Sequence, residues 1–144
     1  MTVWTIGYER LLPPELVAEL QAARIERLID VRFRPQSRRP GMSKTRLAEM
    51  LADQGIAYEH RKALGTPPDI RWHFKHGQAA AGAPLFREHV ERTAAHELDD
   101  LAAEFEHGPR TALMCLEADP AVCHRRILTE ALQRRRPGLD VIDL

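Results

Sequence analysis

Residues 111–135 read TALMCLEADPAVCHRRILTEALQRR, and this stretch decides the fold class. Its first six residues form the most apolar strand candidate, which is typical of a central strand in a parallel sheet. Asp119 and Pro120 then mark a helix start, with an N-cap followed by a proline in the first turn. The helix expected from there to about residue 135 turns four apolar residues inward: Ile127, Leu128, Ala131 and Leu132.

The same alternation of strand and helix extends along the whole chain. Further strands are expected at residues 3–8, 25–31, 56–58 and 139–142. Further helices are expected from Pro13, from the N-cap Ser43 to Gly55, and over residues 85–105. Residues 62–84 contain prolines, glycines and small side chains, which predict a long irregular segment. We therefore expect an α/β fold, a single three-layer domain over residues 1–144 with a mostly parallel sheet of about five strands.

Composition excludes several classes of protein. The chain has 144 residues, 44% of them apolar and 29% charged, which argues against a disordered or membrane-embedded protein. Lys plus Arg and Asp plus Glu each number 21, so no net charge draws the chain to nucleic acid or lipid. No apolar run approaches the ~20 residues of a membrane helix, and the first residues do not resemble a signal peptide. With only two cysteines, we expect a cytoplasmic protein with reduced thiols and no membrane partner.

The end of the central strand and the segment after it carry the first candidate site. In parallel sheets, functional side chains gather at the carboxyl ends of the strands. Cys115 and Glu117 lie at that end, and Cys123, His124 and Arg125 are expected in the first helical turns. A helix N-terminus and an adjacent arginine stabilise a thiolate or a bound anion. The segment is thus a candidate anion cradle, reactive-thiol site or both, although Cys115 by itself could be a buried strand residue.

A basic loop forms the second candidate site. Between residues 32 and 46 there are six basic side chains and no acid. Prolines and a glycine restrict the shapes of this loop, so its charges could be arranged in advance to bind phosphate, carboxylate or a nucleic-acid backbone. The alternative is a solvated loop. Asp30 and Tyr8, at the ends of two other strands, would face the same edge of the sheet. The candidates for anion binding are Tyr8, Asp30, Arg32, Ser37, Arg38, Lys44 and Arg125.

Metal binding and nucleotide-binding loops have weaker support. His73 and His76 have helical spacing but no third ligand beside them. Cys115, Cys123 and His124 could supply metal ligands, together with His60, but the short Cys-x-x-Cys spacing of structural zinc is absent. No metal is therefore assigned. Neither a P-loop nor a Gly-x-Gly-x-x-Gly pattern occurs, so classical nucleotide binding has no support, and the cofactor stays unidentified.

Several motifs together resemble the DUF488 family. They are Thr5-Ile6-Gly7-Tyr8, Asp30-Val31-Arg32, Gly41-Met42-Ser43-Lys44, Gly55-Ile56-Ala57-Tyr58, and Cys115-Leu116-Glu117 with Cys123-His124-Arg125. The resemblance spans nearly the whole chain, with Met42 where the family commonly has phenylalanine. It implies a small bacterial or archaeal α/β protein and no defined activity. The Asp-Val-Arg motif is also similar to rhodanese-like domains, but their catalytic loop, a Cys followed closely by Gly and Arg, is missing.

The leading hypothesis is a small enzyme that acts on an anionic, phosphate-bearing substrate at the carboxyl edge of the sheet. Arg32, Arg38, Lys44 and Arg125 would hold the anion. Cys123 or Cys115 would be the nucleophile or redox thiol, and Glu117 or His124 would move protons. The alternatives are a nucleic-acid-binding module without catalysis and a metal-dependent hydrolase. All depend on the basic loop meeting the cysteine-bearing turn in space.

Overall fold

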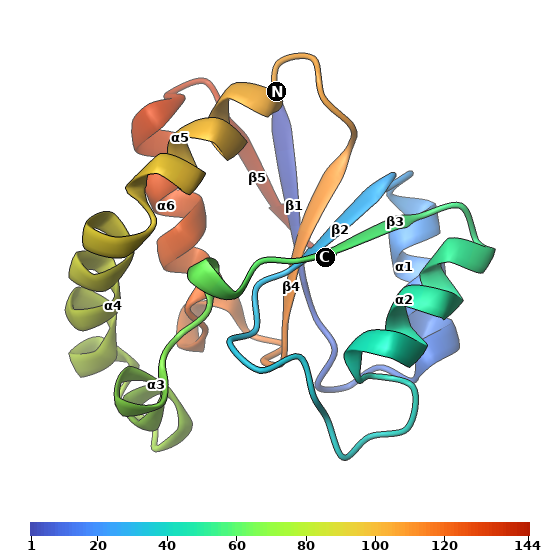
Figure 1. Cartoon of the computed structure of the whole chain (residues 1–144), viewed down its shortest axis with the longest axis horizontal. Helices are drawn as coiled ribbons and strands as arrows, with labels where there is room; N and C mark the ends of the chain where they lie inside the picture. The colour runs from blue at the N-terminus through green and yellow to red at the C-terminus, as the bar shows by residue number, and fades with distance from the viewer.

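The computed structural model describes all 144 residues and contains one five-stranded sheet in the order β3-β2-β4-β1-β5 (Figure 1). The strands are β1 (Thr2–Gly7), β2 (Arg27–Asp30), β3 (Ala57–His60), β4 (Thr111–Cys115) and β5 (Asp140–Asp143). Every neighbouring pair is parallel. The expected α/β fold is confirmed, and the sheet is wholly rather than mostly parallel. β4 is the central strand and all of its residues are buried, as its apolar sequence predicts.

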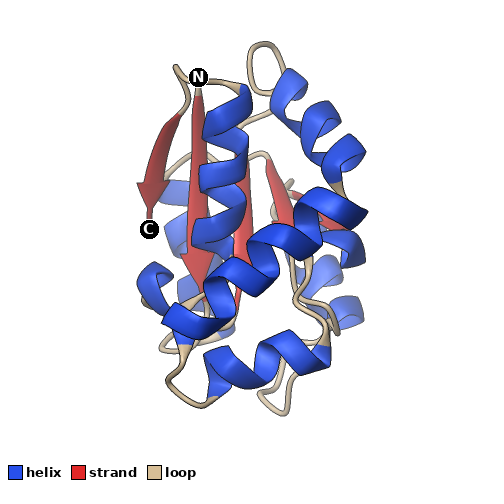
Figure 2. Ribbon diagram, turned by 90° about the vertical axis from the view of Figure 1, so that its left-hand side faces the viewer, coloured by secondary structure: helices blue, strands red, loops and turns tan.

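Helices cover both faces of this sheet (Figure 2). They are α1 (Pro13–Ala22), α2 (Lys44–Asp53), α3 (Pro68–Lys75), α4 (Ala79–Thr93), α5 (Ala95–Glu104) and α6 (Arg125–Arg135), with two short 3-10 helices, η1 (Lys62–Leu64) and η2 (Pro120–Val122). Side chains of α1 and α2 form one apolar cluster with the sheet, and side chains of α3 to α6 form a second. This arrangement gives the three expected layers. No helix has the length and apolar composition needed to cross a membrane.

The prediction of an irregular segment over residues 62–84 is wrong. It contains η1, α3 and the first turns of α4. Pro68 stands in the first turn of α3, where its missing N–H costs no helical hydrogen bond. Gly82 lets α4 approach α3 closely, since a Cβ there would lie 2.9 Å from the ring of Phe74. Pro and Gly therefore start a helix and join two helices here instead of interrupting them.

Two other helix predictions need correction. The single helix expected over residues 85–105 is two helices, α4 and α5, which meet around Ala94. Asp119 caps η2 through the backbone N–H of Ala121, at 2.9 Å, and α6 begins only at Arg125. Cys123 is extended and His124 is the residue before α6. The two residues thus lie in the connection between helices and not in helical turns.

Candidate functional site

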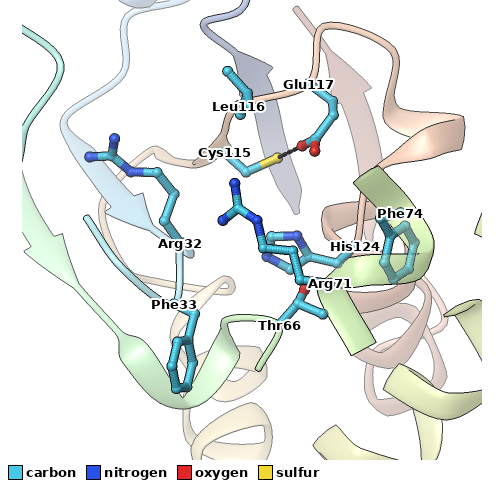
Figure 3. Close-up of a pocket in the computed structure, with 9 residues that line it drawn as sticks. All are labelled: Arg32, Phe33, Thr66, Arg71, Phe74, Cys115, Leu116, Glu117 and His124. Carbon is cyan, nitrogen blue, oxygen red and sulfur yellow. Dashed lines mark hydrogen bonds between the residues drawn. The ribbon is translucent and has the colours of Figure 1, made fainter. Parts of the chain in front are cut away.

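A small cavity lies at the carboxyl edge of the sheet, where β2 and β4 end (Figure 3). Its volume is about 20 Å³, which is room for about one water molecule. The segment after β2, the end of β4, α3 and the connection before α6 all contribute side chains. Four predicted site residues line this cavity together: Arg32, Cys115, Glu117 and His124. The lining also includes Phe33, Thr66, Arg71, Phe74 and Leu116. The start of the basic loop therefore does meet the cysteine-bearing turn.

The two cysteines form a pair. The structure joins Cys115 to Cys123 in a disulfide, and both residues are buried. The expectation of two reduced thiols is therefore wrong for this structure. Cys115 faces the cavity, where its Sγ lies 3.5 Å from Oε2 of Glu117. It also lies 3.2 Å from Nη1 of Arg125. A guanidinium at this distance favours the thiolate of Cys115 once the disulfide is reduced.

Arg125 holds the cysteine-bearing turn in place. Its guanidinium donates to the backbone carbonyls of Glu117 and Ala118 and to Oγ1 of Thr5. The side chain is fully buried, and burial lowers its pKa. The same turn presses against the end of β1, where a Cβ at Gly7 would collide with the carbonyl of Glu117. In this structure the N–H groups of Arg125 bond to the cysteine-bearing turn and to Cys115, and Arg125 does not line the cavity.

Arg32 and Asp30 form a buried ion pair beneath the site. Nη2 and Nε of Arg32 donate to the two carboxylate oxygens of Asp30, at 2.7 and 2.9 Å. Nη1 reaches the hydroxyl of Tyr8 and the carbonyl of Met42. Tyr58 donates to Asp30 from the other side, at 2.5 Å. Burial alone would lower the pKa of Arg32, but the bond to Asp30 outweighs it and raises that pKa. The network ties the ends of three strands to the basic loop.

The basic loop uses several of its predicted residues for its own shape. Oγ of Ser37 accepts from the backbone N–H of Arg39, and its carbonyl accepts from Ser43. Arg39 donates to three backbone carbonyls after β1. Arg38 is exposed and lines a larger cleft next to the cavity, whereas Lys44 is exposed on α2 and lines neither the cleft nor the cavity. Of these residues only Arg38 faces a space large enough for a ligand.

A basic cleft of about 560 Å³ adjoins the cavity and shares Phe33, Thr66 and Arg71 with it. The other residues that line it are Arg34, Gln36, Arg38, Pro68, Trp72, Lys75 and His76. It contains no carboxylate, and none of its arginines and lysine forms an ion pair. Figure 3 shows the guanidinium of Arg71 reaching from α3 toward Cys115.

The contribution of α3 to this cleft was not predicted. The expectation of an irregular segment concealed a helical pattern, because positions 68, 71, 72, 75 and 76 fall on one helix face. Ile70 and Phe74 occupy the opposite face and are buried in the core. The signal that could have identified this wall of the cleft is a set of basic and aromatic residues at i+3, i+4, i+7 and i+8 from Pro68: Arg71, Trp72, Lys75 and His76.

His124 is neutral and oriented. Its Nε2 lies 2.8 Å from the carbonyl of Val31, and only a protonated nitrogen can donate there. Nδ1 is therefore unprotonated, and it lies 3.8 Å from Sγ of Cys123. Burial lowers the pKa of this histidine to about 4. It can accept a hydrogen bond from the Cys123 thiol without carrying charge.

The cysteine pair and His124 are also the side chains best placed to hold a metal ion. Their ligand atoms lie within 4.8 Å of one another, and all three residues are buried. A histidine that donates one ring N–H to a carbonyl is oriented like a metal ligand. The other histidines considered from the sequence, His60, His73 and His76, do not belong to this group.

Stability should fall with acid because of His124. An unfolded histidine titrates near pH 6.5, whereas the folded one stays neutral down to about pH 4. The unfolded state therefore binds more protons in this window, and stability present above pH 6.5 is lost as the pH falls toward 4. We expect a loss of about 2–3 kcal/mol between pH 7.5 and 4.5, measured by urea unfolding. His124→Gln should remove most of this pH dependence, while His107→Gln on the surface should leave it unchanged. If the free energy of unfolding depended on pH equally in both variants, His124 would not be its source.

Comparison with known proteins places the chain in a family. No protein of curated function and no solved structure matches it. The family model described as "Domain of unknown function DUF488" matches residues 13–132. That range includes the basic loop, the wall formed by α3 and the Cys115–Cys123 pair, so the match covers the candidate site as well as most of the sheet. The chain therefore belongs to the DUF488 family.

Proposed function

We propose that this protein is a thiol-dependent oxidoreductase that reduces disulfides carrying anionic groups. One observation supports it most directly: Cys115, paired with Cys123, lines a cavity that shares Arg71 with a carboxylate-free basic cleft. An anionic substrate would bind in the cleft and present its sulfur to Cys115. The cavity holds about one water molecule, so Arg71, which no ion pair holds, would have to turn toward the cleft to admit that sulfur.

The chemistry proceeds in two exchanges. The thiolate of reduced Cys115 attacks one sulfur of the substrate R–S–S–R′, forms a mixed disulfide and releases R′S⁻, which takes the Cys115 proton by way of Glu117. Cys123, oriented by Nδ1 of His124, then attacks the Cys115 sulfur, releases RS⁻ and passes its proton to it. Two electrons move from the cysteine pair to the substrate, and the Cys115–Cys123 disulfide remains. An external dithiol returns the pair to the reduced state by the reverse exchange.

The test is a single turnover with an anionic aromatic disulfide, dithiobis(nitrobenzoate), whose released thiolate is coloured. Reduced protein, freed of reductant, should release two thiolates per chain without denaturant and end with an intramolecular disulfide by mass spectrometry. Cys123→Ser should release one and retain the other half of the probe as an adduct. Cysteines that react only after denaturation, or a Cys123→Ser variant without an adduct, would refute the proposal.

The charge of the cleft adds a second arm to this test. Arg38→Ala should slow the reaction of the anionic probe about tenfold and leave the rate with neutral dithiodipyridine unchanged. The matched control is Arg46→Ala, because Arg46 is an exposed arginine of α2 that does not line the cleft. This substitution should alter neither rate. Equal slowing of both probes by Arg38→Ala would argue against an anionic substrate.

Metal-dependent hydrolysis is the second candidate, favoured by the grouping of Cys115, Cys123 and His124. Two thiolates and a neutral imidazole would leave the fourth coordination position of a zinc ion for water or substrate. Elemental analysis of protein purified under reducing conditions decides this candidate. About one zinc ion per chain, lost in Cys123→Ser, would support it, and protein free of metal would refute it.

A further inference from the structure

We infer that the basic cleft binds a nucleotide, with the phosphate on its cationic side chains and the base against Trp72. The inference rests on the proposed function in one respect, because the nucleotide would be the anionic part of the substrate. The volume of about 560 Å³ lies within the range of small-molecule sites.

The cations of the cleft are free to hold a phosphate. Arg34 and Arg38 come from the basic loop, and Arg71 and Lys75 come from α3 on the other side. None of the four has a carboxylate partner, although the chain carries as many acidic as basic residues. Other arginines, such as Arg27 and Arg135, are paired with glutamates. Unpaired cations on two facing walls suit a ligand that itself supplies negative charge.

Trp72 gives the same cleft a flat aromatic surface. It is 48% exposed, whereas the other tryptophan, Trp4, is buried. Its ring stacks on His76, with centroids 4.4 Å apart and an interplanar angle of 23°. Nδ1 of His76 in turn lies 2.7 Å from the carbonyl of Trp72, which fixes the histidine ring. The indole is thus held in one orientation next to the cations, as in proteins that stack bases beside a phosphate backbone.

Phosphate and aromatic recognition in one cleft favour a nucleotide over other anions. A sugar phosphate or an acidic peptide would use the cations but would leave the exposed part of the indole uncovered. The nucleotide can be a free molecule or one unit of a single-stranded RNA, since both present the same base and phosphate. The two sources differ in how affinity depends on strand length and salt.

The test is calorimetry on the oxidised protein with adenosine 5′-monophosphate, ribose 5-phosphate and a six-residue oligoadenylate RNA. The monophosphate should bind more tightly than ribose 5-phosphate, and Trp72→Ala should remove that advantage, a loss of about tenfold. Lys75→Ala should weaken both ligands, while Arg46→Ala, outside the cleft, should weaken neither. A steep salt dependence with much tighter RNA binding would identify nucleic acid as the source, and similar affinities would identify the free nucleotide.

Two results would overturn the inference: equal affinities for the monophosphate and ribose 5-phosphate, or no effect of Trp72→Ala on the affinity for the monophosphate. Because binding is measured on oxidised protein, it does not depend on thiol exchange. Nucleotide binding without disulfide exchange would refute the proposed reaction alone, and exchange without nucleotide binding would refute this inference alone.

Discussion

Cys115→Ser is expected to abolish the reaction of the reduced protein with the anionic aromatic disulfide, slowing it by about a thousandfold or more. Cys115 is the cysteine that lines the cavity with Glu117 and Arg71, and Arg125 lies beside its sulfur. A serine hydroxyl is not ionised near neutral pH and cannot form a disulfide. Stopped-flow detection of the released thiolate measures the effect.

The matched control is Cys123→Ser, which loses the same disulfide and so shares any loss of stability. Cys123 lines a different hollow, near α4 and α6, and should be dispensable for the first exchange. The initial rate should stay within about threefold of the wild-type rate. If Cys115→Ser kept the wild-type rate while Cys123→Ser lost it, the roles given to the two sulfurs would be wrong.

Asp30→Ala should lower the free energy of unfolding by about 3–5 kcal/mol. Asp30 is fully buried, and the substitution leaves the guanidinium of Arg32 enclosed with only Tyr8 and Met42 as acceptors. A loss of this size is a large part of the total stability of an ordinary domain. Urea unfolding followed by circular dichroism measures it.

Asp99→Ala is the control for this second prediction. Asp99 pairs with Arg135 at 2.6 Å, but its side chain is 60% exposed, so its removal should cost less than about 1 kcal/mol. The double variant Asp30→Ala, Arg32→Met should recover part of the loss, because it removes the uncompensated charge. Similar losses for Asp30→Ala and Asp99→Ala would show that the buried pair contributes no more than a surface pair.

The sequence was most informative where local patterns determine structure. The five strands lie within two residues of their predicted ends, because β-branched and apolar runs mark them directly. α3 was missed because its prolines and glycine neighbours resemble a loop, while its burial comes from contact with α4. Periodicity within a short segment cannot reveal a partner helix that comes later in the chain.

The candidate site was predicted in part, and the limits follow from burial. Arg32 and Arg38 belong to the same basic run, yet Arg32 is buried on Asp30 and Arg38 is exposed in the cleft. No local pattern separates these two environments, since the difference depends on where β2 ends relative to its neighbours. The pairing of Cys115 with Cys123 likewise depends on the extended backbone at Cys123, which an uninterrupted helix would not allow.

The two faces of α3 have different surroundings: one packs in the core and the other lines the basic cleft. Ile70 and Phe74 anchor the helix, while Trp72 and Lys75 meet whatever occupies the cleft. Substitutions on the outward face would therefore change the charge and shape of one wall of the cleft without altering the side chains that anchor α3 in the core. The cysteine pair would stay unchanged by such substitutions, because it lies at the end of β4 and in the connection before α6.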